Sequence, residues 1–230
     1  MITVTQAKPF EVIMQLLAQT QSVYIIGCGT CATMLHTGGK TEVLAMKEKL
    51  EAAGKKVSGW MVIPTACDLI TQEALIEEAP VIDKADSILV LSCAFGVQTV
   101  SSSANKPVYG GLNTLFIGKE DESGQYIEVC MQCGDCVLGQ TAGICPLVRC
   151  AKSLFNGPCG GSVKGKCETD PETPCAWQMI YDRLSAWGKL DQLEDIIPIK
   201  DWSTSLSGGP RRFKIGSSGE ETSGKTPKSN

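Results

Sequence analysis

The chain has 230 residues, of which 12 are cysteine and one is histidine, and its formal net charge is −4. This balance and an aromatic content of only 6% offer neither a basic footprint nor a base-stacking platform, so no nucleic-acid partner is expected. The first residues lack a basic segment followed by a long apolar run, and no stretch has the roughly 18 apolar residues of a membrane span. We therefore expect a cytoplasmic protein with no membrane partner.

Residues 1–118 alternate between amphipathic and uniformly apolar segments. Helical spacing of apolar residues predicts helices over 6–20, 40–53 and 69–79. Short β-branched runs predict buried strands over 22–26, 57–63 and 87–91. This order predicts the α/β class, with a parallel-sheet N-terminal domain covered by helices.

The pattern changes after Pro107. Runs at 115–117 and 126–129 predict a hairpin that leads into a small cysteine-rich domain over 119–202. That region has few long apolar runs, so we expect it to fold around metal. A C-terminal helix is predicted over 175–190, with an apolar stripe formed by Trp177, Ile180, Leu184 and Trp187. The composition from residue 203 to 230 predicts a disordered tail.

A first set of cysteines follows the three predicted strands: Cys28, Cys31, Cys67 and Cys93. The carboxyl ends of parallel strands lie at one edge of a sheet, so these thiols are expected to form one site. Four thiolates suit a [4Fe–4S] cluster or a tetrahedral zinc ion. The glycines around Cys28 would let the backbone approach a bulky cluster.

Three other interpretations of this set stay open. Cys67 and Cys93 can be small core residues, because free cysteine is often buried. Cys28 and Cys31 can form a redox dithiol, although no thioredoxin-like context surrounds them. Residues 27–32 also resemble the dinucleotide motif G-x-G-x-x-A, but the acidic residue expected at the end of the second strand is missing.

A second set begins with the C-x-x-C-x-x-C run of Cys130, Cys133 and Cys136, and Cys145 precedes a proline. This resembles the ferredoxin ligand pattern and favours a cluster over zinc. The set continues with Cys150, Cys159, Cys167 and Cys175. Eight cysteines suffice for two four-thiolate sites, one of which can hold zinc, and the sequence does not partition them. In two-cluster ferredoxins the cysteine before proline serves the other cluster, which would place Cys145 with the later residues.

Nearby side chains are harder to interpret. The bases Arg149, Lys152, Lys164 and Lys166 either offset thiolate charge or form a solvated face. His36 is either a proton carrier or a structural residue. A disulfide framework is a further alternative, disfavoured because disulfides are rare in the cytoplasm.

The cysteine-rich sequence resembles the C-terminal cysteine domain associated with methylenetetrahydrofolate reductases. The resemblance rests on Gly143-Ile144-Cys145-Pro146, Cys150-Ala151-Lys152, Asn156-Gly157-Pro158-Cys159-Gly160-Gly161, Gly165-Lys166-Cys167-Glu168 and Cys175-Ala176-Trp177. With residues 27–32, Thr37-Gly38-Gly39 and residues 91–98, the chain is similar to the small iron–sulfur subunit of the acetogen-type enzyme over roughly residues 10–200.

The resemblance implies a non-catalytic electron-transfer subunit with two or three [4Fe–4S] clusters. It would relay electrons from ferredoxin or another donor subunit to the flavin of a separate β/α-barrel catalytic subunit, which reduces methylene-tetrahydrofolate to methyl-tetrahydrofolate in the reductive acetyl-CoA pathway. A zinc-stapled scaffold subunit of the same or a related complex is the alternative.

Overall fold

The computed structural model describes residues 2–210 and contains two compact units, Met1–Ile127 and Glu128–Asn230. The predicted boundary after residue 118 falls inside strand β6 (Leu112–Glu120). That strand pairs along its length with β1 (Ile2–Ala7), so it belongs to the first unit and the division comes later. Each unit is described by itself below.

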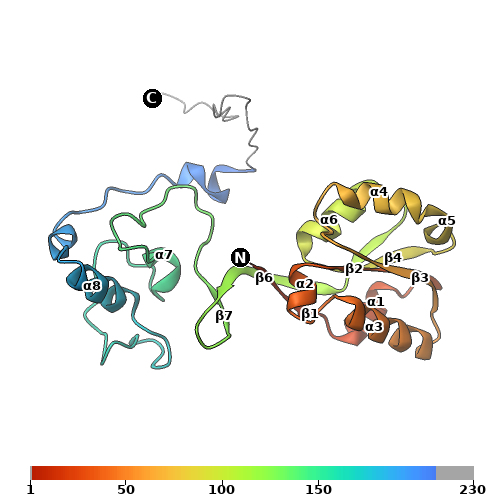
Figure 1. Cartoon of the computed structure of the whole chain (residues 1–230), viewed down its shortest axis with the longest axis horizontal. Helices are drawn as coiled ribbons and strands as arrows, with labels where there is room; N and C mark the ends of the chain where they lie inside the picture. Colours follow the sequence, from red (N-terminus) through yellow and green to blue (C-terminus); the bar gives the residue numbers. More distant parts are fainter. Residues whose placement is uncertain (1, 211–230) are drawn as a thin grey trace. The chain divides into compact units, whose positions relative to one another are not determined.

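The first unit is built on a four-stranded parallel sheet, which confirms the predicted α/β class (Figure 1). Its strands, in spatial order, are β3 (Lys56–Ile63), β2 (Ser22–Cys28), β4 (Ser87–Leu91) and β5 (Val108–Gly110). The chain runs from β2 outward to β3 and then returns past β2 to β4. That reversal makes the carboxyl ends of β2 and β4 a topological switch point, where open α/β sheets bind ligands.

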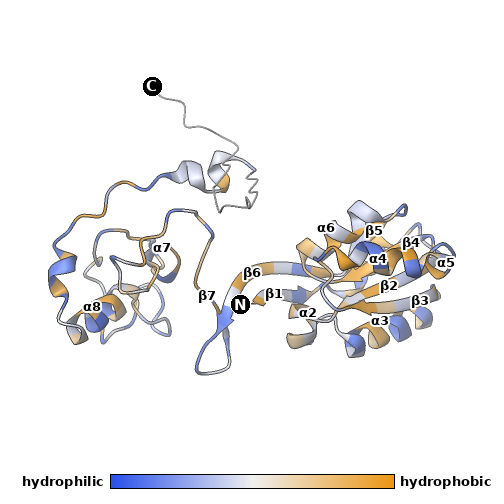
Figure 2. Cartoon of the chain, turned by 45° about the horizontal axis from the view of Figure 1, so that its top comes forward, coloured by the Kyte–Doolittle hydropathy of each residue, from blue (hydrophilic) through white to orange (hydrophobic). Residues whose placement is uncertain are grey.

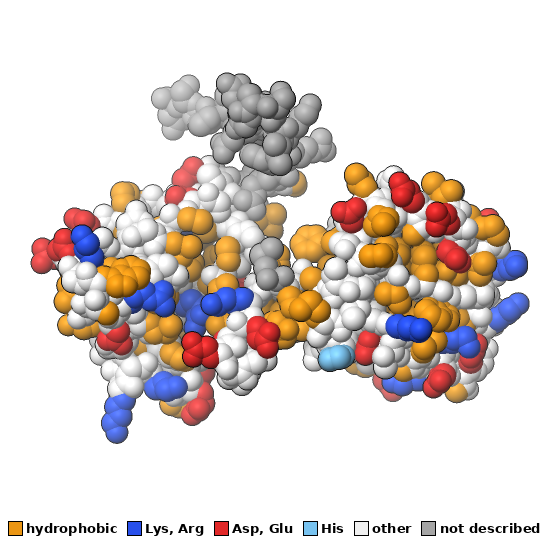
Figure 3. All heavy atoms as spheres, in the orientation of Figure 1, with side chains coloured by type: hydrophobic (Ala, Val, Ile, Leu, Met, Phe, Trp, Pro, Cys, Tyr) orange, Lys and Arg blue, Asp and Glu red, His pale blue; other side chains and the backbone are white. Residues whose placement is uncertain are grey.

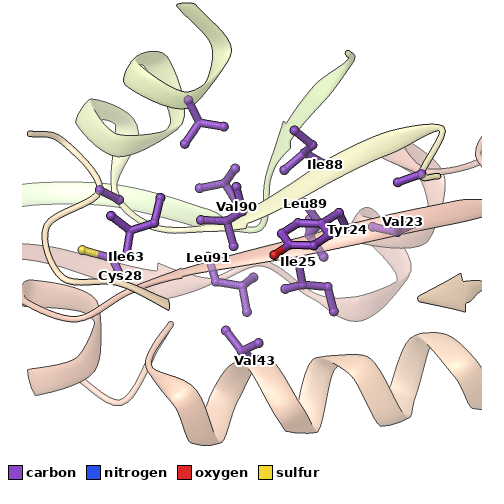
Figure 4. Packing of buried hydrophobic residues seen from close by; sticks show 14 of the residues in the cluster. Val23, Tyr24, Ile25, Cys28, Val43, Ile63, Ile88, Leu89, Val90 and Leu91 are labelled. Atoms are coloured by element: carbon purple, nitrogen blue, oxygen red, sulfur yellow. The ribbon is translucent and has the colours of Figure 1, made fainter. Parts of the chain in front are cut away.

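The two central strands are buried along their whole length and are mostly hydrophobic after the serine that begins each (Figure 2). Ile25 and Ile26 of β2 pair with Leu89 and Val90 of β4, and all four side chains are fully buried. At the end of β2, Cys28 is in register with Ile63, and Figure 4 shows its sulfur beside that side chain. The first cysteine therefore lies at the edge of the hydrophobic core.

Helices cover both faces of the parallel sheet. On one side lie α1 (Phe10–Leu16) and α3 (Lys40–Ala52), and on the other α4 (Ile70–Glu77), α5 (Ala79–Ile82) and α6 (Ala94–Ser103) (Figure 1). The helix predicted over 69–79 corresponds to α4, and α5 begins directly after it. Pro80 occupies the first turn of α5, where a missing N–H costs nothing.

A second, three-stranded sheet has the order β1-β6-β7, with β7 at Tyr126–Glu128. The predicted hairpin is confirmed as β6 and β7. The helix predicted over residues 6–20 was wrong at its start, because residues 2–7 form β1 and pair with β6. Pairing with a strand more than a hundred residues away outweighed the local preference.

The C-terminal unit has little regular structure. It contains α7 (Pro146–Arg149), α8 (Ala176–Ala186) and the 3-10 helices Leu190–Leu193, Trp202–Thr204 and Leu206–Gly208. Trp177, Ile180 and Leu184 of α8 are buried against Ala142 and Ile144. The predicted apolar stripe does not extend to Trp187, because α8 ends at Ala186 and Trp187 is 59% exposed.

The predicted disordered tail was wrong at its start. Ser205 is 5% exposed, and the Thr204 hydroxyl donates a hydrogen bond to the Cys133 carbonyl at 3.0 Å. The remainder of that prediction, residues 211–230, lies outside the described residues.

None of the described helices is long and apolar enough to cross a bilayer. On the face of the molecule drawn in Figure 3, basic and acidic side chains are interspersed rather than gathered by sign.

A core substitution tests how much the parallel sheet depends on β2. Ile26→Ala removes a fully buried side chain from β2, so we expect the free energy of unfolding of the first unit to fall by about 2–5 kcal/mol in urea denaturation. Val12→Ala, on the exposed side of α1, should change it by less than about 0.5 kcal/mol. Equal losses in the two variants would contradict the described core.

Candidate metal centres at the cysteines

The first cysteine set lies at one edge of the parallel sheet. Cys28 ends β2, Cys31 begins the short helix α2 (Cys31–Met34), Cys67 follows β3 and Cys93 follows β4 directly. Cys28 and Cys93 are only 4% and 6% exposed, Cys31 is half-buried, and Cys67 is the most exposed. Cys28 and Cys93 are thus buried at the edge of the core, whereas Cys67 is accessible to solvent.

The loop after β2 is tied back over the switch point by main-chain hydrogen bonds. The N–H of Cys28 donates to the Gly38 carbonyl at 2.9 Å, and the N–H of Gly29 donates to Ile63 at 2.8 Å. Gly38 lies so close to β4 that a Cβ there would come within 2.0 Å of the Leu91 carbonyl oxygen. Glycine at position 38 therefore lets the loop that carries Cys31 approach the strand that leads to Cys93.

Cys67 lies close enough to the other three thiols of this set for them to shift its pKa. Partial burial raises the pKa of the Cys67 thiol, and negative charge on Cys93, Cys28 and Cys31 raises it further. Four thiolates gathered in this way repel one another unless a cation is bound among them. The donor set therefore fits a metal centre that supplies that positive charge.

Two features of the fold favour thiolates at these positions. Cys93 is the N-cap of α6, whose N-terminus carries partial positive charge. The sulfur of Cys28 lies 3.3 Å from the Thr30 hydroxyl oxygen, a distance at which that hydroxyl can donate to a thiolate.

The C-x-x-C-x-x-C run forms a loop in the second unit. The N–H of Gln132 donates to the Cys130 sulfur at 3.4 Å, and Cys133 is 8% exposed. Gly134 has φ +86, and a Cβ there would lie 2.5 Å from the Thr204 carbonyl oxygen. This glycine is required both by the turn and by the approach of the segment around residue 204.

Lys200 packs against the same loop and was missed in the sequence. It is 7% exposed, contacts the Asp135 carbonyl oxygen and lies 3.5 Å from the Asp135 carboxylate. Lys200 is therefore paired with Asp135, a residue of the loop that carries Cys133 and Cys136. No local motif marks it, because Lys200 and Asp135 are 65 residues apart.

The later cysteines line a single cavity. Its walls include Cys150, Cys159, Cys167 and Cys175, together with Arg149 and Lys152. A second hollow, lined in part by Asn156, Tyr181 and Ile196, contains no cysteine. Arg149 and Lys152 thus border the thiols, whereas Lys164 and Lys166 are exposed and do not line the cavity.

Local hydrogen bonds hold the cavity walls. The Thr169 hydroxyl oxygen and the Cys167 sulfur are 3.2 Å apart and share a hydrogen bond, and hydrogen bonding by Thr169 holds the pKa of the Cys167 thiol below its ordinary value. The N–H of Gly161 donates to the Cys159 sulfur at 3.4 Å. Gly157 and Gly160 have φ +103 and +78, as the turn-rich sequence predicts.

No disulfide joins any of the twelve cysteines, all of which lie within the described residues. Among residues 2–210, no three Cys, His, Asp or Glu side chains already stand in the arrangement that holds a metal ion. His36 is exposed in a left-handed turn with φ 52, and its structural and proton-carrying interpretations both stay predictions.

The fold and the thiols define an α/β protein with a strand-end cysteine site and an appended cysteine-rich unit. Residues 109–203 match the family model described as methylene-tetrahydrofolate reductase C terminal. That part of the chain is therefore related to methylene-tetrahydrofolate reductase. No curated protein and no solved structure matches the chain.

A substitution in the loop tests how the strand-end site is positioned. Gly38→Ala forces a Cβ against the Leu91 carbonyl, so we expect the first unit to lose about 3 kcal/mol in its free energy of unfolding, the upper range for overpacking. Gly139→Ala is the control, because its Cβ would meet nothing within 4 Å. Equal denaturation midpoints for Gly38→Ala and the parent would contradict this account of the loop.

Proposed function

We propose that the chain is an iron–sulfur electron-transfer subunit of a methylenetetrahydrofolate reductase complex. The observation that carries the proposal is the position of Cys28, Cys31, Cys67 and Cys93, which all follow the carboxyl ends of strands of the parallel sheet and so lie at one edge of it. These cysteines come from three separate loops, and a structural role for each one alone does not explain why all four follow strand ends at the same edge of the sheet. The relation of residues 109–203 to methylene-tetrahydrofolate reductase supports the choice of complex.

The ligands are assigned as follows. Cys28, Cys31, Cys67 and Cys93 hold one [4Fe–4S] cluster, and the eight later cysteines supply the remaining centres, of which one can hold zinc. Such clusters, when bound, accept and release one electron at a time. Two electrons, taken from a ferredoxin or another donor subunit, then reduce the flavin of a β/α-barrel partner that converts methylene-tetrahydrofolate to methyl-tetrahydrofolate.

The chain's own residues have positioning roles. The main-chain bonds of Cys28 and Gly29 fix the loop, and the core beneath Cys28 and Cys93 excludes water from one side of the site. Cys67 lies at the exposed rim, which gives electrons a route to a partner. Hydrogen bonds and solvent exposure around the sulfurs set the reduction potential of such a site.

Anaerobic mixing with the flavoprotein tests the proposed function. The chain is reduced, freed of excess reductant and mixed with its oxidised flavin-bearing partner, and flavin absorbance is followed. We expect the flavin to be bleached by the reduced chain, and a Cys67→Ser chain to bleach it more slowly. A flavin that stays oxidised with the reduced parent chain would contradict the electron-transfer role and favour the zinc-stapled scaffold.

A further inference from the structure

The eight cysteines of the second unit are not equivalent in space. Cys150, Cys159, Cys167 and Cys175 border one cavity, and Cys145 is absent from its walls. The cavity has a volume of about 20 Å³, room for one water-sized occupant, so these side chains already surround a common space. Spacings of eight or nine residues between them give no sign of this in the sequence.

One polar atom in the cavity wall lacks a partner. The Ser162 hydroxyl oxygen is buried and makes no hydrogen bond in the structure, although Ser162 lines the cavity. A buried hydroxyl without a partner costs free energy, and such groups in native proteins usually have a ligand to bond. A thiolate or sulfide at a metal centre would accept this hydrogen bond.

The electrostatic surroundings suit bound thiolates. Arg149 and Lys152 line the cavity, and Lys152 is paired with Glu168, which lines it as well. Cys175 is the N-cap of α8, which has eleven residues. It therefore lies at the N-terminus of the helix, which carries partial positive charge. Trp177 closes one wall and donates its indole N–H to the Leu154 carbonyl at 2.9 Å.

A one-turn helix separates this group from Cys145. Cys145 is the N-cap of α7 and Cys150 its C-cap, so their α-carbons are about 7–8 Å apart along the axis. Cys145 therefore lies at the opposite end of α7 from the cavity group. This differs from the two-cluster ferredoxin pattern, which would place Cys145 with the later cysteines.

We infer that Cys150, Cys159, Cys167 and Cys175 form one four-thiolate centre for a soft metal, into which the Ser162 hydroxyl donates a hydrogen bond. Cys130, Cys133, Cys136 and Cys145 are left to form a separate centre. The inference rests on the proposed function and deepens it by assigning the eight later cysteines to two separate centres. Four thiolates bind either one zinc ion or one [4Fe–4S] cluster, and the metal analysis below distinguishes the two.

Iron, zinc and acid-labile sulfide per chain test the grouping. Cys150→Ser and Cys175→Ser should each remove one centre, either about one zinc or about four irons with their sulfide. The double variant Cys150→Ser/Cys175→Ser should lose no more than either single variant. The double variant Cys136→Ser/Cys150→Ser should lose two centres. Additive losses for Cys150 with Cys175, or a loss shared by Cys145 and Cys150, would overturn the inference.

Ser162→Ala tests the hydroxyl without removing a ligand. We expect it to keep the metal but to release it to a chelator roughly five- to tenfold faster, the size of one lost hydrogen bond. Ser185→Ala, on the exposed side of α8, should release metal at the parent rate. Equal release rates for Ser162→Ala and the parent would refute the hydrogen bond.

The two proposals fail separately. If these four cysteines share one zinc and the chain holds no iron, the grouping stands and the electron-transfer function fails. If iron–sulfur clusters are present but the losses do not group in this way, the function stands and the grouping fails.

Discussion

Removing metal from the purified chain is expected to unfold the second unit and leave the first folded. The buried core of the second unit consists of Ala142, Ile144, Ala176, Trp177, Ile180 and Leu184. Such a core is too small to stabilise a domain of this size without metal. The first unit has a larger core around β2 and β4 and does not depend on its site for folding.

Hydrogen exchange followed by peptide mass spectrometry measures this effect. After anaerobic chelation, amides over residues 176–186 should lose most of their protection, while those of β2 and β4 keep theirs. Adding back iron with sulfide, or zinc, should restore protection in α8. Unchanged protection in α8 after complete metal removal would show that the second unit folds by its own core.

Replacing a strand-end ligand is expected to remove one whole centre. Cys93→Ser takes away a buried thiol, proposed here as a ligand, that lies near enough to Cys67 to raise the pKa of the Cys67 thiol. We expect the chain to lose about four irons and the matching sulfide, and the electron paramagnetic resonance spectrum of the reduced protein to lose one component. The centres of the second unit should persist, because none of their ligands is changed.

Met34→Leu is the control for that substitution. Met34 ends α2, is 60% exposed and carries sulfur, but it cannot form a thiolate. Its metal content should equal that of the parent. An unchanged iron content in Cys93→Ser would show that Cys93 is an ordinary buried cysteine, the alternative that the sequence left open.

The sequence predicted β2, β3 and β4 because they contain short apolar runs, but it did not predict the edge strand β5, which is only three residues long. The fully buried residues in these strands include Ile25, Ile26, Leu89 and Val90. A short run of such residues is typical of a strand in the middle of a parallel sheet, where both faces are covered. The helix predicted over 40–53 corresponds to α3. Its end was predicted from Gly54, which has the left-handed conformation that commonly ends a helix. Local pattern and tertiary structure agree in these segments.

Two of the misses come from contact between residues far apart in the chain. Residues 2–7 pair with β6, and Lys200 packs on the loop that carries Asp135. Helix α6 was also not predicted, because its run of small and hydroxyl residues has weak helical preference. Nothing in the local sequence encodes these arrangements.

The candidate sites divide in the same way. The position of Cys28, Cys31, Cys67 and Cys93 at one edge of the sheet could be predicted, because the topology of parallel sheets brings strand ends together; their binding of metal stays a prediction. The partition of the later eight could not, because their positions depend on turns and on α7 rather than on a regular element. Cys145 and Cys150 are five residues apart in sequence, yet only Cys150 borders the cavity.

The central claim is that these thiols hold iron–sulfur clusters. The most direct test is iron, zinc and acid-labile sulfide analysis of the anaerobically purified chain, with an electron paramagnetic resonance spectrum after reduction. The account predicts roughly 8–12 irons per chain, matching sulfide, and signals from more than one reduced cluster. A chain that carries zinc without sulfide and gives no signal on reduction would contradict it.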